Sequence, residues 1–248
     1  MNNTGSMFSH IECTSCKKIF SKDEILKLCP VDNCGKVLFP KYDLNIEKSR
    51  KSIDDLKNRE PNMWRYKEFL PVNYEENIIS LGEGFTPILD AKNLAYDIGI
   101  KKLLIKDESL NPTSSFKARG LSAAVSKAKE LGIKKFSIPT AGNAGGALSA
   151  YAAKGNLESY VFMPKDAPQA NKTEVKYFGS NLELIDGYIN DAGKRSLEQS
   201  SNLNLFDVST LKEPYRVEGK KTMGYEIAEQ LNWNLPDHII YPTGGGTG

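Results

Sequence analysis

A single lysine, Lys117, stands where a loop rich in proline, threonine and serine gives way to a helix-forming sequence. The helix is predicted over residues 116–131 because apolar residues recur there with helical spacing, at Leu121, Ala124, Val125, Ala128 and Leu131. Ser115 is the expected N-cap, which places Lys117 in the first turn. The helix dipole opposes a cation at that end, so we expect a pKa below the usual value of about 10.4. A lysine that is often neutral can attack a carbonyl carbon.

All four cysteines form two close pairs near the N-terminus, at Cys13, Cys16, Cys29 and Cys34. Such pairs suit tetrahedral zinc–thiolate coordination better than disulfides in an intracellular protein. Pro30 and Gly35 supply turns around the second pair. The pattern predicts a structural Zn²⁺ and a zinc-ribbon-like module over residues 1–40. Unrelated free thiols are the alternative, and His10 is a substitute candidate ligand.

Two loops of small residues follow predicted strands. The first, residues 139–146 (PTAGNAGG), precedes a predicted helix, and the second is residues 243–248 (TGGGTG). Small residues allow backbone N–H groups to approach a ligand closely, and a helix N-terminus favours an anion. The second loop is not a Walker A loop, because no Gly-Lys-Ser/Thr follows. For the first loop, a turn that merely starts a helix is the alternative.

Strands and helices alternate along the chain from residue 103 onward. Strands are predicted over residues 103–106, 136–139, 159–163, 182–185, 205–207 and 238–241, after a short one at 88–89. Helices are predicted over residues 116–131, 144–154, 169–178, 191–200 and 218–231. This alternation indicates an α/β fold with parallel strands, in which ligands bind at the carboxyl ends of the strands.

Composition excludes several classes of function. The chain has 248 residues, 26% of them charged, and a net charge of +2 with acids and bases interleaved. The sequence contains no strong basic patch, so we do not expect nucleic acid or an anionic membrane as a partner. No apolar run approaches the about 18 residues of a membrane span, and the N-terminus lacks a signal-peptide core. We therefore expect a cytoplasmic protein.

Residues 111–120 (NPTSSFKARG) resemble the cofactor-lysine motif of fold-type II pyridoxal-phosphate enzymes, and among them the threonine synthase family. Without this context, a lysine near a helix start would be read as a solvated surface residue. Three further stretches are similar to the family pattern: MWRYKEFLPV (63–72), LGEGFTP (81–87) and YRVEGKKTMGYEIAE (215–229). The resemblance runs from Cys13 to Gly248.

The resemblance implies a two-domain α/β fold of the tryptophan synthase β type, with the N-terminal zinc-ribbon-like module added. Residues 41–80 would link and dock this module. Residues 81–119 and 205–248 would form part of the large cofactor domain, and residues 120–204 a smaller mobile domain. The family continues beyond the phosphate loop, so a chain that stops at Gly248 is expected to be a fragment with little or no activity.

Site roles follow from the same resemblance. Lys117 would bond covalently to pyridoxal 5′-phosphate and then act as general acid and base. Asn143 would contact the cofactor ring. The substrate carboxylate would be bound by Thr140, Ala141, Gly142 and Ala144. The cofactor phosphate would be bound by Gly244, Gly245, Gly246, Thr247 and Gly248. Residues 187–191 depart from the family pattern expected near a substrate phosphate, and Lys194 or Arg195 is a candidate to supply the charge there instead.

The implied reaction converts O-phospho-L-homoserine and water to L-threonine and phosphate. Threonine or serine dehydratase and cysteate synthase, which belong to the same superfamily, are the nearest alternatives. An alternative of another class is a non-catalytic protein that binds partners through the zinc ribbon. The sequence leaves formation of a homo-oligomer open.

Overall fold

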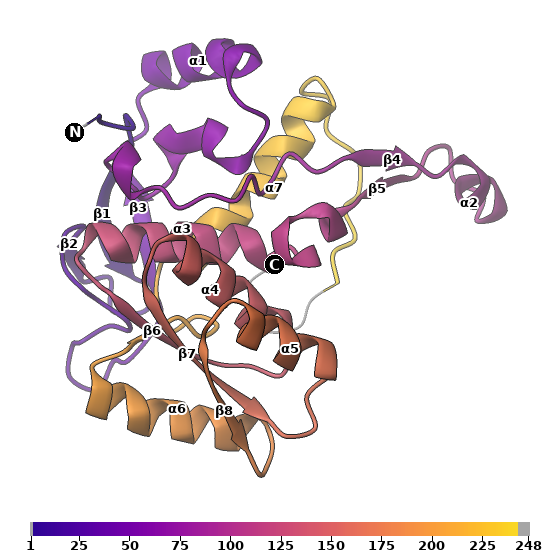
Figure 1. Cartoon of the computed structure of the whole chain (residues 1–248). Helices are drawn as coiled ribbons and strands as arrows, with labels where there is room; N and C mark the ends of the chain where they lie inside the picture. The colour runs from indigo at the N-terminus through magenta and orange to yellow at the C-terminus, as the bar shows by residue number, and fades with distance from the viewer. Residues whose placement is uncertain (1, 243–248) are drawn as a thin grey trace.

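The computed structural model describes residues 2–242 and has a four-stranded parallel sheet as its central layer (Figure 1). The strand order is β8-β7-β6-β9. The strands are β6 (Lys135–Pro139), β7 (Glu158–Pro164), β8 (Asn181–Ile185) and β9 (Phe206–Asp207). Their apolar residues, such as Phe136, Val161 and Met163, are fully buried because both faces of the sheet are covered.

The helices are α1 (Ile46–Asp55), α2 (Lys92–Asp97), α3 (Lys117–Glu130), α4 (Asn143–Lys154), α5 (Gln169–Tyr177), α6 (Ile189–Leu203) and α7 (Arg216–Gln230). The chain moves outward from β6 to β8, so right-handed crossovers place α4 and α5 on one face. The return from β8 to β9 places α6 on the other face (Figure 1). None of the helices in the described residues has the length and apolar character to cross a membrane.

An antiparallel sheet near the N-terminus has the order β2-β1-β3. Its strands are β1 (Phe8–Cys13), β2 (Ile19–Ser21) and β3 (Leu38–Tyr42). Phe8, Ile11 and Leu38 are buried in the same apolar cluster as the central sheet. The Tyr42 hydroxyl donates a hydrogen bond of 2.6 Å to Glu218 of α7. This sheet is therefore packed into the body of the protein.

The segment Met63–Phe69 forms two short 3-10 turns that are mostly buried. Trp64 Nε1 donates a hydrogen bond of 2.9 Å to the fully buried carboxylate of Glu83. The same carboxylate accepts hydrogen bonds from Ser122 of α3 and from Tyr151 of α4. Glu83 thus joins the docking segment to two helices, because a buried carboxylate needs several donors.

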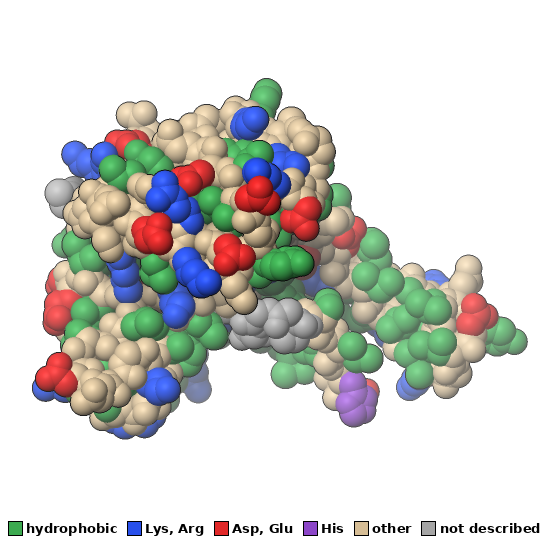
Figure 2. Space-filling view, turned by 90° about the horizontal axis from the view of Figure 1, so that it is seen from below, with side chains coloured by type: hydrophobic (Ala, Val, Ile, Leu, Met, Phe, Trp, Pro, Cys, Tyr) green, Lys and Arg blue, Asp and Glu red, His purple; other side chains and the backbone are tan. Residues whose placement is uncertain are grey.

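A hairpin of β4 (Ile88–Asp90) and β5 (Leu104–Lys106) projects from the body and carries α2 at its tip (Figure 1). Apolar side chains gather on this arm (Figure 2). They include Leu89, Leu94, Tyr96, Ile98, Ile100 and Ile105, each at least 44% exposed. No other described segment pairs with the two strands.

The structure differs from the predicted elements at two places. Residues 238–241 form no strand, because they make no strand pairing with any described segment, and Ile240 is 97% exposed. The short strand β9 lies in the range expected for the large domain, yet it pairs with β6 of the other expected domain. The division of the chain into domains remains a prediction.

Candidate active site

Lys117 is the first residue of α3. Phe116, with helical dihedral angles, precedes it as the cap, so the predicted N-cap at Ser115 is one residue too early. Ser115 nevertheless stabilises the first turn of the helix, because its hydroxyl accepts a hydrogen bond of 3.2 Å from the Lys117 backbone N–H. The prediction that Lys117 lies in the first turn is confirmed.

The Lys117 side chain is half-buried and lies near other basic groups. Burial, and then the nearby charge of Arg216, lowers the pKa of Lys117 below its ordinary value. The amine lies 4.1 Å from the centroid of the Phe116 ring. The pKa of Lys117 thus changes in the expected direction. The causes are burial and the charge of Arg216, whereas the prediction from the sequence relied on the helix dipole. Such an amine is suited to attack a carbonyl.

A second lysine, Lys220 of α7, lies beside Lys117. Gly219 allows this approach, because a Cβ on it would come within 2.0 Å of the Arg119 carbonyl oxygen. Gly120 allows it from the other side, with a Cβ 2.9 Å from the Arg216 carbonyl oxygen. The sequence interpretation gave Lys220 no chemical role. The sequence did contain a signal, because each helix has a glycine next to a basic residue. This signal could be interpreted only once α3 and α7 were known to pack together.

The loop before α4 contains the other candidate residues. Thr140 is buried, and its hydroxyl and the Gly142 backbone N–H are 3.1 Å apart. Asn143 is exposed, and its Oδ1 accepts a hydrogen bond of 3.0 Å from Asn171 of α5. A Cβ on Gly142 would meet open space. The helix α4 packs on the turn Pro112–Ser114 that precedes Lys117, so the structure brings this loop's helix and the lysine loop together.

Two glycines of this loop serve packing rather than ligand approach. A Cβ on Gly145 would clash with Met163 and Thr140. A Cβ on Gly146 would lie 1.9 Å from a carboxylate oxygen of Glu174. Close contact with protein neighbours therefore explains the small residues at these two positions. Of the predicted carboxylate-binding residues, Ala141 is exposed and Ala144 is buried at the helix start.

The predicted phosphate loop, with Gly244, Gly245, Gly246, Thr247 and Gly248, lies outside the described residues. The two cations suggested for a substrate phosphate are paired with acids. Lys194 lies 3.4 Å from Asp191, and Arg195 lies 2.6 Å from Glu183. Both belong to α6, on the sheet face opposite α4, so the structure gives no support to a role for either one.

The four predicted metal ligands lie together. The sulfur atoms of Cys13, Cys16, Cys29 and Cys34 are all within 4.8 Å of one another. Two sulfur pairs, Cys13–Cys34 and Cys16–Cys29, are 3.6 Å apart. Thiolates around a tetrahedral Zn²⁺, each about 2.3 Å from the metal, have a similar separation. His10 is not in this group, and its Nδ1 instead lies 2.7 Å from the Ser9 hydroxyl.

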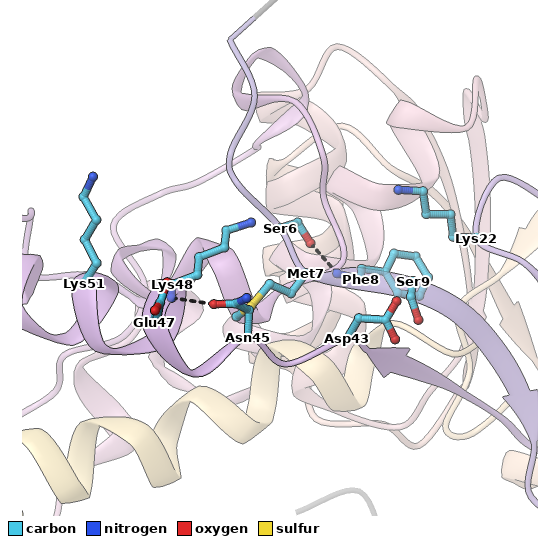
Figure 3. A pocket seen from close by; sticks show the side chains of 10 residues that line it. All are labelled: Ser6, Met7, Phe8, Ser9, Lys22, Asp43, Asn45, Glu47, Lys48 and Lys51. Carbon is cyan, nitrogen blue, oxygen red and sulfur yellow. Dashed lines mark hydrogen bonds between the residues drawn. The ribbon is translucent and has the colours of Figure 1, made fainter.

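An open groove of about 790 Å³ lies between the N-terminal strand and α1 (Figure 3). It is lined by Ser6, Met7, Phe8, Ser9, Lys22, Asp43, Asn45, Glu47, Lys48 and Lys51. No predicted site residue is in this set. Its three lysines lie near two acids on an exposed surface, so the groove does not form part of the lysine site.

Glu213 is a buried glutamate just before α7, and its ionisation should make the stability of the protein depend on pH. Its carboxyl accepts hydrogen bonds from the backbone N–H groups of Tyr215 and Arg216, yet burial raises its pKa to about 7. An unfolded glutamate has a pKa of about 4.3. The contribution of Glu213 to folding is therefore fully present below about pH 4.3. It is lost as the pH rises to about 7, by about 3 kcal/mol.

The Glu213→Gln variant tests this dependence. The stability of the wild type relative to the variant should fall by about 3 kcal/mol between pH 4.5 and pH 8. Urea denaturation at several pH values gives this difference. The exposed Glu47→Gln variant is the control and should show a nearly constant difference. If the difference in stability between the wild type and Glu213→Gln did not change with pH, the Glu213 carboxyl would be ionised in the folded protein over this whole pH range.

Comparison with known proteins shows the family of this chain. Residues 79–248 match the family described as pyridoxal-phosphate dependent enzyme. The chain belongs to this family.

Among curated proteins, it is 36% identical over 233 residues to threonine synthase of Methanocaldococcus jannaschii, covering 94% of this chain and 56% of that protein. Threonine synthase of Methanosarcina acetivorans is 35% identical over 236 residues, with coverage of 95% and 56%. The chain thus spans about half the length of these relatives.

Solved structures agree on the fold. An Escherichia coli diaminopropionate ammonia lyase in complex with D-serine superposes with a TM-score of 0.59 at 17% identity, covering 92% of this chain and 56% of that one. Threonine deaminase isoform 2 from Solanum lycopersicum gives 0.55 at 20% identity, covering 84% and 53%. The predicted α/β fold-type II architecture is confirmed.

Proposed function

We propose that this chain carries part of a pyridoxal-phosphate-dependent lyase that converts O-phospho-L-homoserine and water to L-threonine and phosphate. The observation that carries the proposal is the half-buried Lys117, with its lowered pKa, at the start of α3. The threonine synthases that are similar over 94–95% of the chain support this substrate.

The residues around Lys117 fit a phosphorylated aldehyde cofactor. The amine is available for a covalent bond to the aldehyde carbon, and basic groups of α7 lie beside it. The Thr113 hydroxyl, in the loop before the lysine, is buried and has no hydrogen-bond partner among the described residues. A polar ligand would satisfy this hydroxyl. When bound, pyridoxal phosphate would supply an electron sink for carbanion chemistry.

The protein's own residues would bind the substrate and move its protons. Lys117, released from its covalent bond, would take a proton from the substrate and return it at another carbon. Gly142, which faces open space, and the backbone N–H groups at the start of α4 would bind a carboxylate. Asn143 would orient the cofactor ring, which requires release of its hydrogen bond with Asn171.

Product analysis tests the proposed reaction. A longer protein that contains this chain is incubated with pyridoxal phosphate and O-phospho-L-homoserine, and threonine and phosphate should appear in equal amounts, whereas the chain of 248 residues alone should show little or no turnover. Release of ammonia and a 2-oxo acid from threonine or serine would indicate a dehydratase. Cysteate from phosphoserine and sulfite would indicate a cysteate synthase. Lack of covalent cofactor binding together with lack of turnover would favour a non-catalytic binding protein.

We further propose that Cys13, Cys16, Cys29 and Cys34 bind one structural Zn²⁺. The close sulfur atoms support this proposal, because four thiolates form a closed tetrahedral set. Cys13 and Cys29 are buried at the edge of the main apolar cluster. The metal would thus stabilise the N-terminal sheet against the body of the protein.

Removal of the metal should destabilise the protein strongly. The Cys29→Ser variant should contain less than one zinc per chain and lose several kcal/mol of unfolding free energy, since structural zinc contributes on the order of 10 kcal/mol in small peptides. Elemental analysis and thermal unfolding measure the two effects. His10→Ala is the control and should retain one zinc. Full stability of metal-free wild type would contradict the proposal.

A further inference from the structure

A cavity of about 350 Å³ lies between the segment before Cys29, the last turns of α6 and the end of β9. This volume is within the range of small-molecule pockets, which is about 300–1,000 Å³. The cavity brings together three segments that are far apart in the sequence. Its lining includes Lys27, Leu28, Leu197, Ser200, Asp207 and Lys212.

The cavity is separate from the lysine site. The helix α6 leads from the carboxyl end of β8 back to the start of β9, so its last turns lie near the amino ends of the parallel strands. The loop before Lys117 packs on α4, which covers the other face of the sheet. Ser200 closes the cavity toward the sheet, because it is buried and its hydroxyl lies 2.8 Å from the Ser137 hydroxyl of β6.

Asp207 places a buried carboxylate in the wall of this cavity. The residue is only 7% exposed, and its Oδ1 accepts hydrogen bonds from the backbone N–H and the hydroxyl of Ser209. Oδ2 accepts none from the described residues. The charge of Arg216 acts on Asp207, but the Arg216 Nη1 donates to the Val208 carbonyl oxygen instead. Since a buried carboxylate normally uses both oxygens, Oδ2 is available to a donor in the cavity.

Two lysines bring positive charge to the same cavity. The Lys27 amine donates a hydrogen bond of 3.1 Å to the Leu205 carbonyl oxygen and lies 6.0 Å from the Phe206 ring centroid. This holds the amine in place and leaves two of its three N–H groups for a ligand. Lys212 is exposed at the rim. Within residues 2–242, neither lysine lies within ion-pair distance of an acid.

This combination of charges selects the chemistry of the ligand. A metal cation would be repelled by the two lysines, and a simple anion such as phosphate would be repelled by Asp207. A small molecule that carries both charges fits, with an ammonium group for the carboxylate and a carboxylate for the lysines. Leu28 and Leu197 supply apolar contact for an aliphatic side chain.

We propose that this cavity binds a free α-amino acid with an aliphatic side chain. Asp207 accepts a hydrogen bond from the ammonium group, and Lys27 and Lys212 bind the carboxylate. The ligand thereby joins the segment before Cys29 to α6 and β9. This inference does not depend on the proposed function, because it uses neither Lys117 nor the cofactor.

Calorimetric titration with L-valine tests the charge requirement. Isovalerate is L-valine without the ammonium group, and isobutylamine is L-valine without the carboxylate. One L-valine should bind per chain. Each analogue should bind at least about tenfold more weakly, because it loses a charge-assisted hydrogen bond.

Three variants test the location of the ligand. Asp207→Asn keeps an acceptor for Ser209 but removes the charge, Lys212→Met removes a cation, and Ser201→Trp fills the cavity from an exposed position of α6. Each should weaken L-valine binding by about tenfold or more. Thermal unfolding checks the fold of each variant. If Asp207→Asn is unfolded, the two substitutions of exposed residues decide the question.

Two variants outside the cavity are the controls. Lys194→Met removes an exposed lysine of α6 that does not line the cavity, and Lys117→Ala removes the lysine of the candidate active site. Both should bind L-valine as the wild type does. The inference is overturned if Lys117→Ala alone abolishes binding, if isovalerate binds as well as L-valine, or if the cavity variants bind normally. Lack of binding at about 10 mM L-valine, where a ligand with a Kd of about 1 mM would nearly saturate, also overturns it.

Discussion

The Lys117→Ala variant is expected to lose covalent capture of pyridoxal phosphate completely. In the wild type, the lowered pKa of Lys117 leaves more of its amine neutral than in an ordinary lysine, so it reacts with the aldehyde first. Without this amine, the visible absorbance band of the bound cofactor should be absent. The fraction of protein trapped by borohydride at this site should fall from near one to background, which peptide mass spectrometry measures directly.

The Lys117→Arg variant is the control for charge. It keeps the positive charge at the start of α3 but cannot form the covalent bond, so it too should show no band. Lys165, whose side chain is 59% exposed, should react only at higher aldehyde concentration in all variants. Equal labelling of the two lysines in the wild type would mean that burial does not activate Lys117, and the assignment of the site would then fail.

Replacing Arg119 with methionine is expected to cost about 3–5 kcal/mol of unfolding free energy. Arg119 is fully buried and binds two carboxylates, Glu108 at 2.7 Å and Glu226 at 2.7 Å. Its removal leaves Glu226, which is also fully buried, with Lys106 as the remaining basic partner at 2.8 Å. Urea denaturation at pH 7 measures the loss. This residue follows Lys117 by two positions, yet its expected effect is on stability.

The matched control is Arg50→Met, since Arg50 is an exposed residue of α1. That change should alter stability by no more than about 0.5 kcal/mol. A second measurement separates charge from packing. Lowering the pH to protonate Glu226, whose pKa Arg119 lowers, should destabilise the wild type more than Arg119→Met, because the variant has already lost the main partner of this carboxylate. If both proteins respond equally, the ion pairs contribute little.

Local sequence patterns predicted most of the parallel α/β unit. The helix starting at Lys117, the strand Lys135–Pro139 and the helix starting at Asn143 all lie within two residues of their predicted positions. Helical spacing and small-residue loops are encoded within a few neighbouring residues, so they can be recognised without the tertiary structure. The clustering of the four cysteines was also predictable, because metal-ligand spacing is a local property.

Features that depend on distant contacts were not predictable. Residues 238–241 have the composition of a strand but no described neighbour to pair with, and pairing is a tertiary property. The position of Lys220 beside Lys117 depends on the close packing of α3 and α7 at Gly120 and Gly219. The close contact between Gly146 and the Glu174 carboxylate likewise could be recognised only from the structure. In each case, the deciding partner is far away in the sequence.

The packing of the N-terminal sheet has a consequence for synthesis on the ribosome. Phe8 of β1 contacts the Tyr215 ring, with centroids 6.5 Å apart, and Lys27 donates a hydrogen bond to the Leu205 carbonyl oxygen. The Tyr42–Glu218 hydrogen bond joins residues 176 positions apart. At about 5–20 residues per second, translation delivers the later partner on the order of ten to thirty seconds after the earlier one.

During this interval the four cysteines have been made, but much of the main apolar cluster to which Cys13 and Cys29 belong has not. Nascent thiols would then be open to oxidation or to a wrong metal. Early zinc capture would protect them and hold β1 and β3 in register until α7 emerges. With the proposed Zn²⁺ bound, the order in which the chain leaves the ribosome would make the cysteine cluster a folding safeguard as well as a structural element of the finished protein.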